Sequence, residues 1–120
     1  MRLSAVLLAG FAISAIALPV SAAKPAATTP ITITATAEQK FTPDHVVLHV
    51  GKPQTLRFTS TGGVHGVASS DLGIPATTIM PGTPVSVVVT PAKAGTYVVH
   101  CTIVCGPGHA DMALTVVVKP

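Results

Sequence analysis

The sequence contains few charged residues and almost no aromatic ones. Only 9% of its 120 residues are Asp, Glu, Lys or Arg, aromatic residues make up 3%, and there is no tryptophan. Scarce aromatic rings remove the stacking platforms that single-stranded nucleic acids need, and a formal net charge of +3 is too small and too scattered to attract a nucleic acid. The sequence also lacks a Ser/His/Asp arrangement, a phosphate-binding loop and paired carboxylates. We therefore expect no nucleic-acid partner and no stand-alone catalytic activity.

The first 22 residues have the features of a secretory signal peptide. Arg2 supplies a positive start, residues 5–20 form an apolar run, and Val20-Ser21-Ala22 places small residues where a signal peptidase cuts. The run approaches the roughly 20 residues that a membrane span needs, so an uncleaved N-terminal anchor stays open as an alternative. We expect export to the periplasm or another extracytoplasmic space, and no stable membrane insertion once the leader is cleaved. A flexible linker is expected over residues 23–30 and one domain over residues 31–120.

From Ile31 onward the pattern is typical of β-structure. Short runs rich in Val, Ile and Thr alternate with Gly and Pro, and no segment has a helical apolar stripe. This pattern predicts an all-β fold, a two-sheet antiparallel Greek-key β-sandwich. We expect the protein to be a monomer. Seven strands are expected, at Ile31–Ala37, His45–Val50, Gln54–Ser60, Val64–Ser69, Pro84–Thr90, Thr96–Cys101 and Met112–Val118.

One segment near the C-terminus concentrates soft metal ligands. Cys101, Cys105, His109 and Met112 follow the spacing C-x3-C-x3-H-x2-M, and the sequence has no other cysteine. Thiolate, imidazole and thioether together select copper over Mg²⁺ or Ca²⁺, whereas zinc sites usually have Cys and His without a thioether. A further ligand should come from elsewhere in the chain, and His65 is the best candidate.

Other interpretations of these residues stay open. In an oxidising compartment Cys101 and Cys105 could form a disulfide. A mononuclear site with His65, one cysteine, His109 and Met112 is a further alternative. The remaining histidines are expected on the surface, and Met80 in the core or at its rim.

The motifs resemble the cupredoxins, and in particular the CuA (two-copper) domain of cytochrome c oxidase subunit II and nitrous oxide reductase. The similarity spans about Phe41 to Val118 and rests on His65, on the C-x3-C-x3-H-x2-M run and on the turns and strand that lead to it. The resemblance implies two copper ions bridged by the thiolates of Cys101 and Cys105. It also implies that His65 and His109 each bind one copper, and that Met112 and the main-chain carbonyl of Ile103 are weak axial ligands.

The sequence also departs from the subunit II pattern. That family usually has a Glu where this chain has Ile103, an aromatic residue where it has Gly66-Val67, and a membrane-spanning hairpin ahead of the domain. A free-standing exported domain therefore fits better than an oxidase subunit. The resemblance implies one-electron transfer with a redox partner protein. The alternative function is a periplasmic copper carrier or chaperone that delivers copper to an oxidase or another acceptor.

Overall fold

The computed structural model describes residues 10, 12, 14–17 and 29–120. In this part of the chain it contains nine strands and one short 3₁₀ helix. Most of the predicted signal peptide (1–22) and linker (23–30) lies outside the described residues. Among the residues that are described, no helix has the length and apolar character to cross a membrane. The elements are β1 (Ile31–Ala35), β2 (Phe41–Thr42), β3 (His45–His49), β4 (Gln54–Ser60), β5 (His65–Ser69), β6 (Ile74–Ile79), β7 (Val85–Val89), β8 (Gly95–His100), η1 (His109–Asp111) and β9 (Ala113–Lys119).

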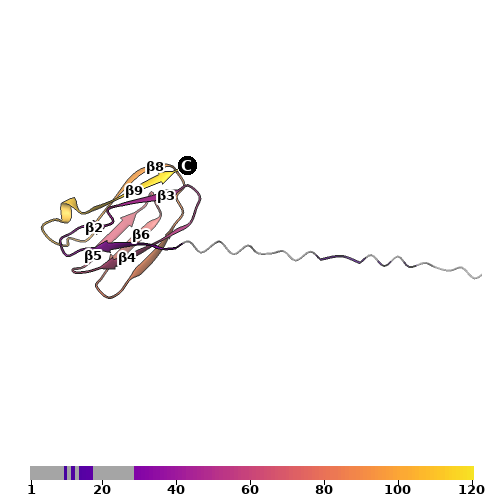
Figure 1. The fold of residues 1–120 in the computed structure, drawn as a ribbon, viewed down its shortest axis with the longest axis horizontal. Coiled ribbons are helices and arrows are strands. Elements are labelled where there is room, and N and C mark those ends of the chain that lie inside the picture. The colour runs from indigo at the N-terminus through magenta and orange to yellow at the C-terminus, as the bar shows by residue number, and fades with distance from the viewer. Residues whose placement is uncertain (1–9, 11, 13, 18–28) are drawn as a thin grey trace, which may run out of the picture.

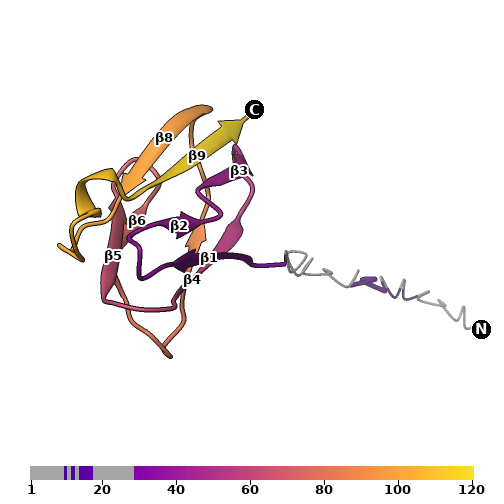
Figure 2. The ribbon, with the colours of Figure 1, turned by 60° about the vertical axis from the view of Figure 1, so that its left-hand side comes forward.

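The strands form two main sheets and a smaller third one. The first sheet has the order β2-β1-β4-β7, the second has the order β3-β9-β8, and β5 pairs with β6. The two main sheets form the layers of a sandwich, with η1 and its loop at one end (Figures 1 and 2). The predicted all-β, two-sheet sandwich is therefore confirmed.

The strand pairing corrects one part of the prediction, because the sandwich is not wholly antiparallel. Strand β1 runs parallel to β4, with Ile31 opposite Leu56, and β3 runs parallel to β9, with His45 opposite Thr115. Between β1 and β4 the chain passes through β3, which belongs to the other sheet. A chain that crosses to the opposite layer before it returns can enter its first sheet again in the same direction, so alternation alone does not reveal the pairing.

The core lies between the sheets and is formed largely by alternate residues along the strands. In β3, Val46 and Leu48 are buried while the residues between them are exposed, because successive strand residues point to opposite faces. The same alternation buries Leu56 and Phe58 in β4. Each such side chain contributes about 1.5–3 kcal/mol by burial. The buried set includes Ile33, Val67, Ile79, Val89, Val99, Leu114, Val116 and Val118.

Two strands and one helix were not predicted. Strand β2 has two residues, too few for a detectable alternation, and β6 carries Pro75 and several exposed positions. The first predicted strand ends two residues early, because Thr36 N–H donates to the Lys40 carbonyl (2.8 Å) and closes a turn. Met112, expected at a strand start, instead follows η1 and precedes β9.

Candidate metal centre

His65 stands at the start of β5, directly after a glycine turn that fixes its ring. Gly63 takes a positive φ of 78°, which glycine adopts without steric cost, and the turn is closed by hydrogen bonds of the Ser60 hydroxyl. The imidazole is fully buried, and its Nε2–H donates to the Gly62 carbonyl over 2.8 Å. A carbonyl accepts only, so this bond assigns the proton to Nε2 and leaves Nδ1 as the basic nitrogen.

The Nδ1 atom of His65 is buried and has no hydrogen-bond partner among the described residues. A buried acceptor without a partner costs about 1–3 kcal/mol, which makes it a feature that requires an explanation. Histidines that bind metals commonly donate the other ring N–H to a carbonyl, as His65 does to Gly62. The ring is therefore in the tautomer and orientation of a metal ligand.

Cys101 follows β8 and is brought to His65 by the pairing of β5 with the end of β8. Val67 forms an antiparallel bridge with Cys101, and the Thr102 N–H donates to the Gly66 carbonyl (3.0 Å). From the other side, the Cys101 N–H donates to the Met112 carbonyl (3.1 Å). Cys101 is therefore held from both sides and is 5% exposed.

Cys105 is the centre of the sulfur cluster. Its Sγ atom lies 3.6 Å from the Cys101 Sγ, 3.6 Å from the Met112 Sδ and 3.7 Å from the His109 Nδ1. Both cysteines are free thiols. Ligand atoms of His65, Cys101 and Cys105 all lie within 4.8 Å of one another.

The other two predicted ligands lie at the edge of this group. His109 is half-buried on η1 and contacts Cys105, but it is not within the tight set that includes His65. The Cys101 thiol donates to the Ile103 carbonyl over 3.1 Å, so this carbonyl faces the sulfur atoms. The structure thus brings all six predicted site residues to one end of the sandwich, with His109 the least integrated.

The surroundings make the Cys105 thiol harder to ionise. Burial, and then the hydrogen bond and charge interaction with Cys101, raise the pKa of Cys105 above its ordinary value. A thiol must lose its proton to bind a metal, so metal binding here releases a proton that the protein otherwise retains. The raised pKa keeps the Cys105 thiol protonated until a metal cation displaces the proton.

These donors fit a soft metal ion. Metal–thiolate bonds are about 2.3 Å long, so sulfur atoms 3.6 Å apart can bind the same ion. The basic Nδ1 of His65 supplies an imidazole, and Met112 places a thioether against Cys105. Two thiols, an imidazole and a thioether form the donor set that selects copper.

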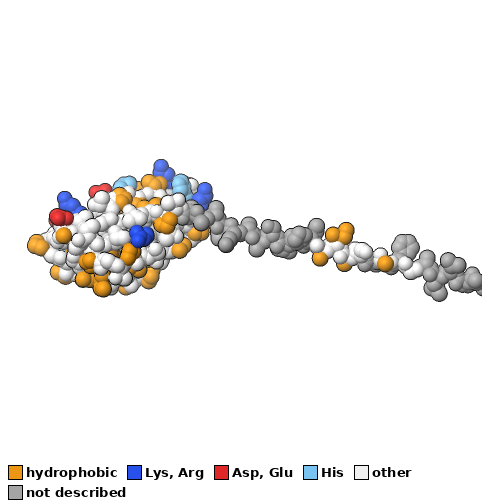
Figure 3. All heavy atoms as spheres, turned by 60° about the horizontal axis from the view of Figure 1, so that its bottom comes forward, with side chains coloured by type: hydrophobic (Ala, Val, Ile, Leu, Met, Phe, Trp, Pro, Cys, Tyr) orange, Lys and Arg blue, Asp and Glu red, His pale blue; other side chains and the backbone are white. Residues whose placement is uncertain are grey.

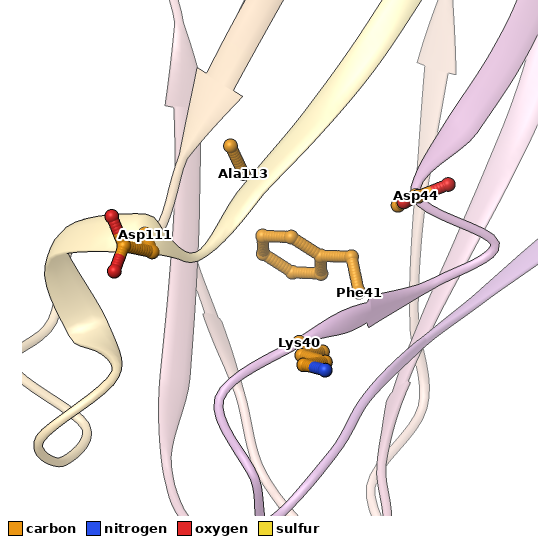
Figure 4. Close-up of a pocket in the computed structure, with 5 residues that line it drawn as sticks. All are labelled: Lys40, Phe41, Asp44, Asp111 and Ala113. Carbon is orange, nitrogen blue, oxygen red and sulfur yellow. The ribbon is translucent and has the colours of Figure 1, made fainter.

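Some residues that carry polar chemistry lie outside this centre. A hollow of about 210 Å³ beside η1 is lined by Lys40, Phe41, Asp44, Asp111 and Ala113. The two aspartates lie on opposite sides of the Phe41 ring (Figure 4), so they do not form a converging carboxylate pair. His45, His49 and His100 are exposed, as expected for surface histidines.

The ligand loop carries an exposed apolar side chain. Val104, between the two cysteines, is 83% exposed. Met80, expected in the core or at its rim, is 46% exposed. On the face shown in Figure 3, most of the charged and histidine side chains lie along the upper edge of the domain, and apolar side chains are frequent along the lower edge.

The sequence did not predict the residues that orient these ligands. The Gly62-Gly63 pair beside His65 does indicate a tight turn, and a carbonyl of that turn is the group that orients the imidazole. The side-chain oxygen of Gln39 accepts a hydrogen bond from Gly108 N–H (3.2 Å). The sequence did not indicate this contact, because Gln39 and Gly108 are 69 residues apart.

Comparisons with solved structures show similar folds in copper proteins and oxidases. A chain of a heme-copper terminal oxidase dimer aligns with 25% identity and a TM-score of 0.65, over 75% of this chain and 64% of that chain. This chain thus spans less than two thirds of that protein. The periplasmic domain of cytochrome oxidase subunit II (CoxB) of Bradyrhizobium japonicum aligns with 18% identity and a TM-score of 0.67, over 75% and 83% of the two chains. Auracyanin A, a "blue" copper protein of Chloroflexus aurantiacus, aligns with 21% identity and a TM-score of 0.52, over 76% and 100%.

A search among curated protein sequences gave no match. The family model for the cupredoxin-like domain, however, matches residues 5–116, nearly the whole chain. With its two-layer sandwich and a cluster of soft donors at one end, the chain belongs to the cupredoxin-like domain family.

Proposed function

We propose that this protein is an exported copper protein that transfers single electrons and holds copper in a CuA-like site. Cys101 and Cys105 would hold the copper through thiolates, and His65 and His109 through imidazoles. Met112 and the Ile103 carbonyl would be weaker ligands. Bound copper would supply the one-electron couple between Cu(I) and Cu(II), and the protein's own residues would fix its ligands.

One observation carries this proposal. The Nδ1 of His65 is buried without a hydrogen-bond partner in the described chain, and it lies in the same 4.8 Å group as the two thiols. Burying this nitrogen costs free energy unless a cation or a proton satisfies it. A soft cation would satisfy the imidazole and the two thiols together.

The arrangement suits electron transfer because the ligands come from a rigid frame. Cys101 is tied to β5 and to Met112 by backbone hydrogen bonds, and His65 is tied to Gly62. Ligands that move little between two oxidation states lower the cost of exchanging an electron.

The two-copper form is favoured over a mononuclear one by the cysteines. A single-copper site of the blue type needs one thiolate, and here two thiol groups face each other with a third soft donor, Met112, against the second. A mononuclear site of this one-thiolate type would leave one cysteine without a function next to the metal.

Copper titration tests the proposal. The protein is reduced under anaerobic conditions and titrated with Cu(I) in competition with a chromophoric chelator, and Cys105→Ser is titrated in parallel. We expect two equivalents for the wild type and at most one for the variant. One equivalent in both proteins would support the mononuclear alternative, and no tight binding by the reduced wild type would contradict a copper function.

The second candidate function is a copper carrier that delivers the metal to an oxidase or another acceptor. The observation that favours it is the exposure of the loop ligands, since Cys105 and His109 are only half-buried and can meet an acceptor's ligands. A carrier would lose Cu(I) to an acceptor within seconds to minutes, whereas an electron carrier would retain it through repeated oxidation and reduction. Stopped-flow transfer to a chelator of higher affinity separates the two functions.

We propose for either function that the protein acts outside the cytoplasm, as a monomer, with a protein partner. The low content of charged residues and the exposed apolar side chain of Val104 suit brief contacts with that partner. Retention of the N-terminal segment as an anchor would keep the same domain at the membrane surface.

A further inference from the structure

The turn between β1 and β2 contacts both of the chain segments that carry candidate copper ligands. This turn, Thr36–Lys40, is termed the brace turn below. In Figure 1 it lies at the same end of the sandwich as η1 and the ligand loop. None of its residues is a candidate ligand, so its contacts there need their own explanation.

Gln39 connects the brace turn to the ligand loop. The Gly108 N–H donates to the Gln39 side-chain oxygen over 3.2 Å. A Cβ atom at Gly106 would lie 2.7 Å from the Gln39 amide carbon, and one at Gly108 would lie 3.1 Å from the Gln39 Cβ. A side chain at either position would crowd Gln39, and Gly106 also takes a positive φ of 150°, which favours glycine. The loop between Cys105 and His109 therefore rests directly on Gln39.

Ala37 connects the same turn to the His65 segment. A Cβ atom at Gly62 would lie 2.9 Å from the Ala37 Cβ, so the Gly62 backbone also packs directly on the brace turn. The Thr61 N–H donates to the Ala35 carbonyl (3.0 Å) and fixes the approach. The Gly62 carbonyl is the group that holds the His65 ring.

Gln39 itself is fixed at both ends of its side-chain amide. Its oxygen accepts from Gly108, while its nitrogen donates to the Ala37 carbonyl within the turn. Its backbone has a φ of 56°, which is uncommon for a residue other than glycine, and its N–H donates to the Thr36 carbonyl (3.1 Å). A residue held in this conformation presents its amide in one orientation.

We infer that Gln39 is a positioning residue, and that the brace turn sets the separation between His65 and the loop ligands Cys105 and His109 before any metal binds. This inference rests on the proposed copper function and extends it. The turn reaches His65 through Gly62 and reaches the loop through Gly108, so one rigid unit fixes both halves of the site. Loss of the brace would loosen the loop and weaken its hold on copper.

Two variants and a control test this role in the whole mature protein. Gln39→Gly removes the side chain and suits the positive φ, so the turn itself can still form. Gln39→Glu keeps an acceptor oxygen for Gly108 and loses the donor to Ala37. The matched control is Gln54→Ala, which removes the chain's other glutamine. Gln54 begins β4, roughly 20 Å at the usual strand rise from Ser60, where β4 ends near the site. Its side-chain amide donates to the carbonyls of Thr29 and Thr55.

The first measurement is amide hydrogen exchange in the reduced, metal-free protein. We expect the Gly108 amide to exchange at least tenfold faster in Gln39→Gly, while the Thr102 amide, bonded to Gly66, keeps its wild-type rate. Gln39→Glu should stay within about threefold of the wild type at Gly108, and Gln54→Ala should not change it. If the Gly108 and Thr102 amides accelerate equally in Gln39→Gly, the substitution loosens the whole protein. If Gly108 exchange is unchanged, Gln39 does not protect this amide. Either result would overturn the inference.

The second measurement is copper binding by the same proteins. In Gln39→Gly we expect Cu(I) affinity to fall about tenfold and the copper electron paramagnetic resonance spectrum to shift, with wild-type values in the control. A spectrum and affinity identical to the wild type, despite faster Gly108 exchange, would also overturn the positioning role. If the wild type binds no copper, the proposed function fails, and the exchange data still decide whether the brace exists.

Discussion

At the residue scale, the centre depends on Cys105, because this sulfur atom contacts three other donors. Cys101, Met112 and His109 each have a donor atom within 3.7 Å of it. Burial raises the pKa of Cys105, although its side chain is only half-buried. Substitutions at Cys105 and at the donors around it therefore test which side chains bind the metal and which only fill the core.

Met112→Leu should change the reduction potential and spectrum of bound copper without changing the fold. Met112 is fully buried, and leucine fills a similar volume, so the loss of stability should stay below about 1.5 kcal/mol. Loss of the thioether removes an axial ligand, and we expect a higher reduction potential and an altered visible spectrum. Leu114→Met, on the same buried face, is the control and should leave potential and spectrum at wild-type values. An unchanged potential in Met112→Leu would remove Met112 from the ligand set.

The raised pKa of Cys105 predicts the pH dependence of the metal-free protein. A thiol in the unfolded chain ionises near pH 8.5, and the folded protein retains its proton to higher pH. The stabilisation is therefore fully present below about pH 8 and is lost as the pH rises through the folded pKa. Between pH 7 and pH 10, the free energy of unfolding in urea should fall more for the wild type than for Cys105→Ser. Equal losses in the two proteins would disprove the raised pKa.

At the scale of elements, the contact between β5 and the ligand loop requires a glycine. A Cβ atom at Gly66 would lie 2.4 Å from the Thr102 hydroxyl and 3.0 Å from the Ile103 side chain. Gly66→Ala should therefore push the loop away from β5 and destabilise the protein by about 1–3 kcal/mol in urea unfolding.

The same contact offers a control. Thr102 is exposed, so Thr102→Ala alone should change stability by less than about 0.5 kcal/mol. The double variant Gly66→Ala/Thr102→Ala should recover part of the loss, because the nearest obstacle is gone while Ile103 remains. A Gly66→Ala protein as stable as the wild type would contradict the close approach.

What the sequence predicts well at this scale is local. The recurring runs rich in Val, Ile and Thr located β3, β4, β8 and β9. The ligand run could be recognised because its four donors fall within twelve residues.

What the sequence could not predict depends on contacts between distant segments. The parallel pairing of β1 with β4 depends on where the chain returns after crossing between layers. The contact of Gln39 with Gly108 joins residues 69 positions apart, and nothing in the local pattern of either indicates it. Strand β6 was missed because its exposed positions interrupt the alternation.

At the scale of the whole molecule, the proposed function requires export. Expression of the full chain in a bacterium should yield a soluble periplasmic protein that begins at Ala23 or Lys24, shorter by 22 or 23 residues, as small residues at positions 20–22 suit signal peptidase. Intact mass spectrometry of the periplasmic fraction checks this. Full-length protein in the membrane fraction would instead support the anchor alternative.

We propose that one end of this sandwich binds two copper ions through the thiolates of Cys101 and Cys105. The most direct test is the electron paramagnetic resonance spectrum of the mature protein after reduction, copper loading and reoxidation. One unpaired electron shared by two copper nuclei should give a seven-line hyperfine pattern, and Cys105→Ser should lose it. A four-line pattern from a single copper in the wild type would contradict the claim.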